Sequence, residues 1–152
     1  KIFREYVKFS ENAQKIIRQI EETFTNKKII GVHIRRTDHF TEYPPVPLAT
    51  YQQMLKQEAE NFDHIFLATD DQNIVNELIN EFGSKVMCLG AYRSQNQSSV
   101  HLGSNFKNKY KLGFDALLDC YCLSLCQKII ITHSNFSYAA LIFNPEIPYQ
   151  IL

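Results

Sequence analysis

The sequence predicts an α/β fold in which a parallel β-sheet carries helices on both faces. Short β-branched runs alternate with segments of helical period along the whole chain. Those runs are apolar on both faces, which is typical of strands buried between two layers of helices. The 152 residues are 45% hydrophobic, enough for the core of one domain. We therefore predict a single Rossmann-like domain over residues 1–152.

The same pattern predicts each element in turn. In chain order we expect a helix over 4–24, a strand over 27–34, a loop at Pro44, Pro45 and Pro47, a helix over 48–62, a strand over 64–70, a helix over 71–83, a strand over 85–90, a polar loop over 91–111, a helix over 114–127, a strand over 128–132, a helix over 135–144 and a strand over 149–152. The third helix has Asp70 or Asp71 as its N-cap and Gly83 as its C-cap.

The charge balance excludes a broadly basic or acidic protein. Sixteen Lys and Arg residues match sixteen Asp and Glu residues, so no overall field attracts nucleic acid or an anionic membrane. No apolar run approaches the roughly 20 residues that a membrane span needs. We therefore expect no nucleic-acid partner and no membrane contact from this segment, and any anion site must be local.

The four cysteines favour core packing. Cys120, Cys122 and Cys126 fall in one predicted helix, and Cys88 falls in a predicted strand. Their spacing is not a usual zinc pattern, and a buried thiol often serves as a small hydrophobic group. A disulfide or a metal site is the alternative.

The polar residues gather where the predicted strands end. These strand ends read HIRRTD, LATDD, LGAYR and ITHSNFS. In parallel α/β sheets, ligands bind beyond the carboxyl ends of the strands. The sequence therefore predicts a ligand site at this one edge of the sheet.

The first strand end indicates a phosphate site. Side chains alternate along a strand, so His33 and Arg35 share one face while Arg36 points to the other. An arginine side chain presents a planar fork of donors that suits phosphate oxygens, and Asp38 could hold one of the two. The alternative is a structural ion pair between Arg36 and Asp38. The sequence contains neither a G-x-G-x-x-G nor a Walker pattern.

A second anion-binding element is expected where the fourth strand turns into a helix. Ser134, Asn135 and Ser137 lie at this turn, and the first N–H groups of a helix attract anions. Simple N-capping by Ser134 or Asn135 is the alternative, and capping is compatible with phosphate binding.

Carboxylates complete the edge. If Asp70 or Asp71 caps the third helix, the other carboxylate is left free. Asp115 and Asp119 are one helical turn apart and face the same side, where they could accept hydrogen bonds from a donor-rich ligand such as guanine. Glu42, in the proline loop, is a candidate general base whose alternative is a solvated surface position. No D-x-D pair is present to hold a metal on a diphosphate.

Taken together, these motifs resemble a known enzyme family. GVHIRRTD, then FLATDD, then LLDCYCLSLCQKIIITHSNFSYAA resemble, in order and spacing over residues 29–144, the three motifs of GDP-fucose-dependent fucosyltransferases. The pattern is most similar to the core α1,6 type and its bacterial nodulation relatives, and Thr37 favours this branch. His39 stands where the family has a lysine, and the gap from Asp38 to Glu42 is one residue shorter.

The resemblance implies a GT-B fold of which this chain supplies the donor-binding half, with the acceptor domain upstream and absent here. It implies inverting transfer of fucose from GDP-fucose to a glycan acceptor, with no metal and no other cofactor. The implied compartment is the cytoplasm in a bacterium and the Golgi lumen in a eukaryote.

The resemblance also implies roles for individual residues. Arg35 would clamp the diphosphate and stabilise the departing GDP. Glu42 would be the catalytic base, assisted by Asp70 or Asp71. The implied nucleotide contacts are His33 against the nucleotide, Arg36 and Asp38 supporting the arginine loop, Asp119 reading guanine, and Ser134 and Asn135 meeting the β-phosphate. The alternatives are a transferase for another nucleotide sugar, a non-catalytic nucleotide-binding module, and a structural domain whose arginines pair only with Asp38 and Asp70.

Overall fold

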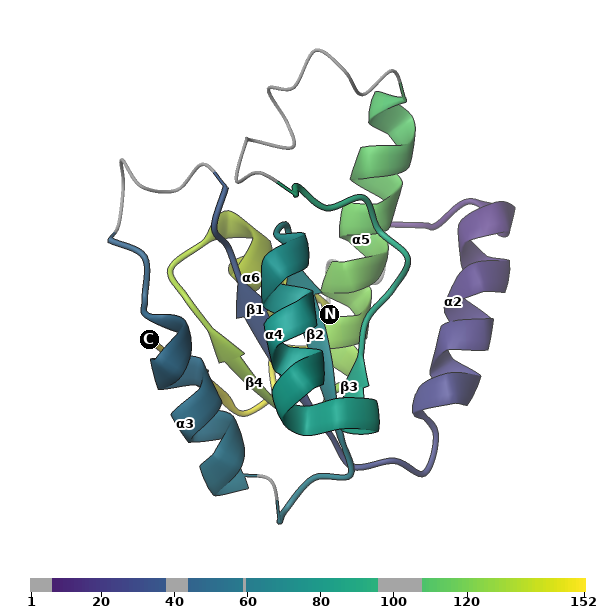
Figure 1. The fold of residues 1–152 in the computed structure, drawn as a ribbon. Helices are drawn as coiled ribbons and strands as arrows, with labels where there is room; N and C mark the ends of the chain where they lie inside the picture. Colours follow the sequence, from purple (N-terminus) through teal and green to yellow (C-terminus); the bar gives the residue numbers. More distant parts are fainter. Residues whose placement is uncertain (1–6, 38–43, 59, 96–107) are drawn as a thin grey trace.

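The structure is a computed structural model that describes residues 7–37, 44–58, 60–95 and 108–152 (Figure 1). Asp38 and Glu42 lie outside the described residues. Within the described residues, no helix is both long and apolar enough to cross a membrane.

A five-stranded, fully parallel sheet forms the centre of the fold. The strands lie in the order β3-β2-β1-β4-β5, so the chain builds the sheet outward from β1 in both directions. The strands are β1 (Ile29–Ile34), β2 (His64–Thr69), β3 (Val86–Met87), β4 (Lys128–Ile131) and β5 (Tyr149–Ile151). The predicted parallel α/β architecture is confirmed.

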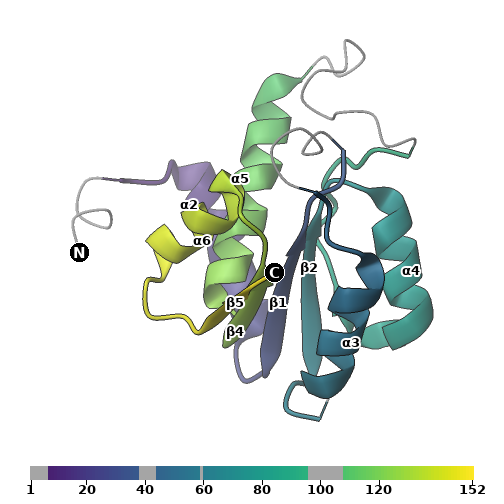
Figure 2. The ribbon, with the colours of Figure 1, turned by 90° about the vertical axis from the view of Figure 1, so that its left-hand side faces the viewer.

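Helices cover both faces of the sheet, as Figure 2 shows. They are α2 (Glu11–Phe24), α3 (Leu48–Glu58), α4 (Gln72–Phe82), α5 (Lys109–Leu125) and α6 (Asn135–Phe143), with a short 3-10 turn at Gly83–Lys85. In Figure 2, α2, α5 and α6 lie on one face, and α3 and α4 lie on the other.

Two hydrophobic clusters hold these layers together. One packs α2, α5 and α6 against the sheet around Phe66, Leu123 and Ile129, and the other packs α3 and α4 around Leu67 and Leu78. All six residues of β1 are buried, and side chains of this strand pack into both clusters. Its carboxyl end is therefore rigidly placed, which a preorganised site requires.

Gly31 allows α5 to pack closely on β1. A Cβ atom at this position would lie 2.9 Å from Ile129 Cγ2 and 3.0 Å from both Cys126 Sγ and Leu123 Cδ2. The tight packing brings the end of α5 onto the first strand, and with it the face of α5 that carries the buried acid described below.

The cysteines behave as core residues, as predicted. Cys120, Cys122 and Cys126 are buried, and no disulfide joins cysteines among the described residues, which include all four. Burial raises the pKa of the Cys120 thiol to about 12 and that of Cys126 well above its usual range. These thiols are therefore not reactive thiolates.

Most departures from the predicted elements are at their ends. The caps of α4 are as predicted, since Asp71 caps its start and Gly83, at φ 60°, ends it. The first helix starts at Glu11 behind the N-cap Ser10, so the helix predicted from residue 4 was wrong over 7–10. The loop predicted over 91–111 was wrong at its end, because Asn108 caps α5 and the helix runs through Gly113.

Candidate functional site

The carboxyl edge of the sheet holds a cavity of about 100 Å³. Its walls come from β1, β2, the segment after β3, α5 and α6. The lining residues are His33, Arg35, Thr69, Asp70, Ala91, Tyr92, Leu112, Asp115, Ala116, Asp119 and Phe136. Residues from three strand-to-helix connections and from helices α5 and α6 thus meet at the edge where the sequence predicted a ligand site.

His33 is fixed at the bottom of this site by α6. Its side chain is buried, and its Nδ1 lies 2.7 Å from Ser137 Oγ, which is itself fully buried. The imidazole also lies against the ring of Phe136, with 4.5 Å between centroids and 30° between planes. The hydrogen bond to Ser137 therefore fixes the orientation of the His33 imidazole. Ser137 comes from the start of α6, the strand-to-helix turn at which the sequence predicted a site.

The arginine segment after β1 is held by Asp70. One carboxylate oxygen accepts a hydrogen bond from the Arg36 backbone N–H at 2.9 Å. The other accepts from the Thr37 hydroxyl at 2.6 Å and from the Thr37 N–H at 3.3 Å. The expectation that capping by Asp71 leaves Asp70 free was therefore wrong, because Asp70 accepts three hydrogen bonds from the segment that follows Arg35.

The two arginines point to opposite faces, as the strand alternation predicted. Arg35 lines the cavity, whereas Arg36 does not appear among its lining residues in the described part of the chain. The Arg36 charge instead acts on Tyr51 of α3, a 2% exposed side chain on the far face of the sheet. Burial raises the pKa of Tyr51 to about 12, and the arginine opposes this shift.

Asp71 is a structural residue of α4. Its carboxylate accepts from the Asn73 N–H at 2.8 Å, and the side chain is 2% exposed. It is not among the described residues that line the cavity. Asp71 thus fixes the start of the helix, and the acid of this pair that faces the site is Asp70.

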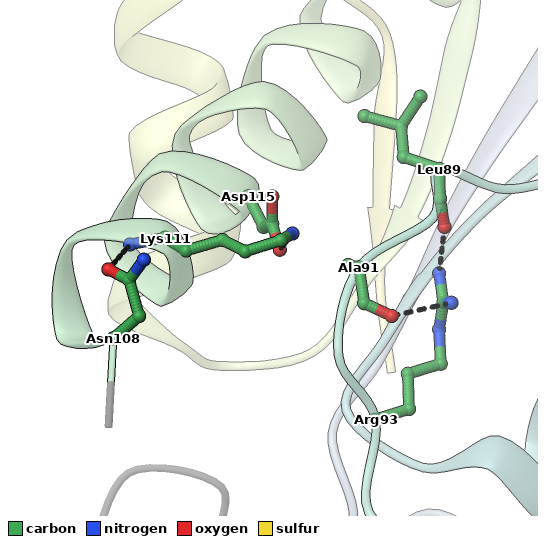
Figure 3. A network of polar contacts seen from close by, with 6 residues as sticks. All are labelled: Leu89, Ala91, Arg93, Asn108, Lys111 and Asp115. Atoms are coloured by element: carbon green, nitrogen blue, oxygen red, sulfur yellow. Dashed lines mark hydrogen bonds and ion pairs between the residues drawn. The ribbon is translucent and has the colours of Figure 1, made fainter. Parts of the chain in front are cut away.

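The two acids of α5 both line the cavity, but their environments differ. Asp115 accepts from Lys111 Nζ at 2.6 Å, a pair near the start of the helix (Figure 3). Asp119 is 5% exposed, and its Oδ1 has no hydrogen-bond partner among the described residues. An unsatisfied buried carboxylate oxygen is rare in a folded protein and is typical of a site that a ligand completes.

Burial raises the pKa of Asp119 from its ordinary 3.8 to about 7, with Arg93 opposing the shift and Asp115 adding to it. Because the pKa is higher in the folded state, the stability associated with this group is present at low pH and is lost as the pH rises from about 4 to about 7. Near neutral pH the site therefore contains an acid that readily gains or loses a proton.

The start of α6 lies beside the site. Ser134 is buried and its Oγ accepts from the Phe136 N–H at 3.2 Å, so its capping role is confirmed. Asn135, the first helical residue, is exposed. Neither is among the described lining residues of the cavity, to which α6 contributes Phe136.

Arg93 is a residue that the sequence reasoning missed. The strand end LGAYR marked its position, but its role depends on a guanidinium that folds back onto the chain, donating to the carbonyls of Leu89 at 2.8 Å and Ala91 at 3.2 Å (Figure 3).

Among the described residues, no group of three His, Cys, Asp or Glu side chains could hold a metal ion.

No family model and no curated protein matches this sequence. Among solved structures, the chain is similar to the NodZ α-1,6-fucosyltransferase co-crystallised with GDP, with a TM-score of 0.65 and 24% identity over 95% of this chain and 45% of that one. The fucosyltransferase NodZ from Bradyrhizobium gives a TM-score of 0.62 and 23% identity, with the same coverage. POFUT1 in complex with GDP-fucose gives 0.57 and 9% identity over 97% of this chain and 47% of that one.

NodZ is an α-1,6-fucosyltransferase, the type that the sequence motifs resemble, and POFUT1 belongs to the same superfamily of GDP-fucose-dependent enzymes. The chain spans less than half the length of each. It therefore has the Rossmann-like fold that forms part of these fucosyltransferases.

Proposed function

We propose that this chain is the donor-binding part of a GT-B glycosyltransferase that transfers fucose from GDP-fucose to a glycan hydroxyl, with inversion and without a metal ion. The observation that carries the proposal is the meeting of Arg35, His33 and Asp119 around one cavity at the carboxyl edge of the sheet. Structures with this fold have been solved with GDP and with GDP-fucose, which supports the choice of donor.

The base of the donor occupies the inner cavity. Guanine presents N1–H and N2–H₂ on one edge, and Asp119 offers a buried carboxylate oxygen that lacks a partner among the described residues. Accepting these donors requires the charged carboxylate, and binding of the base favours that form. Leu112, Ala116 and Phe136 supply apolar surface for the planar ring.

The diphosphate lies toward the mouth, between the arginine segment and α6. Arg35 supplies a permanent positive charge and a fork of donors. The Asp70 hydrogen bonds to Arg36 and Thr37 hold the backbone of this segment in place. Ser134 and Asn135 bring the N-terminal N–H groups of α6 to the β-phosphate.

Transfer then proceeds by direct displacement. Glu42 takes the proton of the acceptor hydroxyl as that oxygen bonds to the anomeric carbon of fucose, while Asp70 holds the arginine segment in place. The bond from this carbon to the diphosphate oxygen breaks, and its electron pair leaves with GDP. Arg35 stabilises the charge that develops on the leaving group, a role that metal ions fill in other transferases.

Calorimetric titration tests the donor assignment. GDP, GDP-fucose, UDP and ADP would be titrated into the purified chain with and without Mg²⁺, and GDP would be titrated again into Arg35→Ala. We expect GDP and GDP-fucose to bind in preference to UDP and ADP, with no effect of Mg²⁺, and Arg35→Ala to weaken binding about 30-fold or more.

The exposed Arg18 on α2 offers a matched control, because Arg18→Ala removes the same charge away from the cavity. Equal affinity for UDP or ADP would point to another nucleotide sugar. Assays with glycan acceptors would separate an enzyme from a nucleotide-binding module: Glu42→Gln would remove most turnover but keep GDP affinity. Unchanged GDP affinity in Arg35→Ala would overturn the assignment.

A further inference from the structure

Ala91 and Tyr92 form the wall of the cavity that comes from the segment after β3. This segment is irregular, yet its far end is hydrogen-bonded to the chain between β2 and α4. The Ser94 N–H donates to the Asp70 carbonyl at 2.8 Å, and the Ser94 carbonyl accepts from the Gln72 N–H at 2.9 Å. The wall is thus tied to the same Asp70 that holds the arginine segment.

Arg93 closes the near end of the same wall. Its guanidinium folds back and donates to the carbonyls of Leu89 and Ala91, so the backbone between them curves around the charged group (Figure 3). The side chain is 9% exposed, and its Nε has no hydrogen-bond partner among the described residues. A buried cation held only by carbonyl oxygens needs an anion nearby to offset its desolvation.

The Arg93 charge acts on Asp119 of α5. Burial raises the pKa of Asp119 to about 7, and the charge of Arg93 is the influence that opposes this rise. The other titratable side chains that line the cavity are His33, Arg35, Asp70, Tyr92 and Asp115. Asp70 accepts hydrogen bonds from the arginine segment, and Asp115 is paired with Lys111. The Asp119 charge also raises the pKa of the Cys120 and Cys122 thiols.

We propose that Arg93 is a positioning residue of the nucleotide site: it shapes the Ala91–Tyr92 wall and favours the charged form of Asp119, and so selects a base with two adjacent N–H donors. This inference rests on the proposed function for the identity of the base. Two properties of the Arg93 side chain contribute to recognition: its guanidinium hydrogen bonds shape the wall, and its charge acts on Asp119.

The two properties predict different effects for two variants. Arg93→Gln removes the charge, so Asp119 holds its proton to higher pH and accepts base donors over a narrower pH range. Arg93→Lys keeps the charge but loses the planar fork, so Asp119 should titrate nearly as before while the wall loses its shape. A residue that merely stabilised the fold would not separate the two effects.

The experiment follows the Asp119 carboxyl by ¹³C NMR between pH 5 and 9 in the ligand-free chain, with Asp119→Asn to assign the signal. We expect Arg93→Gln to raise the midpoint above that of the wild type, and Arg93→Lys and the control Arg18→Gln to leave it nearly unchanged. GDP affinity is then measured by calorimetry over the same pH range, with circular dichroism to confirm folding.

We expect GDP affinity of the wild type to rise with pH through the Asp119 midpoint and then level. At pH 7 Arg93→Gln should bind GDP about three- to tenfold more weakly and recover at higher pH, whereas Arg93→Lys should be weaker at every pH. An unchanged Asp119 midpoint in Arg93→Gln would overturn the role of the charge. GDP affinity equal to wild type in Arg93→Lys would overturn the role of the fork.

The ligand-free titration separates this inference from the proposed function. If no variant binds GDP but the Asp119 midpoint still rises in Arg93→Gln, the donor assignment fails while the electrostatic role of Arg93 stands. Should Arg93→Gln fail to fold, Arg93→Lys and the pH dependence of GDP binding by the wild type still decide, because a flat pH profile contradicts the role given to Asp119.

Discussion

Two pairs of acids lie at the same edge of the sheet, and they are used in opposite ways. Asp70 and Asp71 accept hydrogen bonds from neighbouring backbone N–H groups, at 2.9 Å from Arg36 and 2.8 Å from Asn73 respectively. Asp119 is buried like Asp71, yet one of its oxygens has no partner among the described residues.

The difference shows how similar carboxylates are divided between scaffold and site. Backbone N–H donors stabilise the charged form of an acid. Asp70 and Asp71, which follow β2, therefore stabilise the arginine segment and the start of α4. Asp119 lacks that satisfaction, and its ionisation costs stability until a ligand supplies donors. The four substitutions below test this division through stability, from the largest expected effect to the smallest.

Asp119→Asn should stabilise the protein at high pH. The pKa of Asp119 is about 7 in the folded chain against an ordinary 3.8, so the ionised group costs up to about 4 kcal/mol of folding free energy above pH 7. Urea unfolding at pH 5 and pH 8 would show the wild type losing stability with pH and the variant losing less. Equal pH dependence of the two proteins would contradict the account.

Asp70→Ala should have a large effect of opposite sign. It removes the acceptor of the Arg36 N–H, the Thr37 N–H and the Thr37 hydroxyl, and Thr37 is only 6% exposed. Leaving these donors unsatisfied should cost about 3 kcal/mol. Thermal unfolding measures the loss, with Asp70→Asn as the control that retains one acceptor; a variant as stable as the wild type would show that the clamp is dispensable.

Asp71→Ala should cost about 1 kcal/mol, the usual value of an N-cap. The loss should be confined to α4, because the cap accepts from the Asn73 N–H. Hydrogen exchange of the first turn of α4 would reveal the fraying, and Asp71→Asn, which keeps a capping oxygen, should restore protection. Uniformly faster exchange throughout the sheet would argue against a local role.

Asp115→Asn should change stability by no more than about 0.5 kcal/mol, because its partner Lys111 is 51% exposed and surface pairs contribute little. The Asp115 charge also raises the pKa of Asp119, so its removal should lower the Asp119 titration midpoint slightly. Denaturant unfolding and carboxyl NMR check the two effects; a loss of several kcal/mol would mean that Asp115 belongs with the scaffold acids.

Much of the fold was readable because local pattern and tertiary structure agree. The β-branched runs that became β1, β2 and β4 are buried strands, and Asp71 and Gly83 punctuate α4 as predicted. Where they disagreed, prediction failed: the polar composition of residues 91–111 indicated a loop to its end, yet Asn108 caps α5 and the helix begins at Lys109.

The sequence predicted which residues form the site, but not which residues they contact. Strand alternation separated Arg35 from Arg36, and helical spacing put Asp115 and Asp119 on one wall. The hydrogen bond from Thr37 to Asp70 joins residues 33 apart in the chain, and the fold-back of Arg93 depends on the path of the backbone before it. Neither contact has a local sequence signal.

The central claim is that Asp119 faces the ligand while Asp70 holds the scaffold, and carboxyl NMR during addition of GDP tests it most directly. At pH 7 we expect the Asp119 signal to move toward the ionised form as GDP is added, the Asp70 signal to stay in place, and UDP to have little effect on either. An Asp119 signal that ignores GDP, or that moves equally with UDP, would contradict the account.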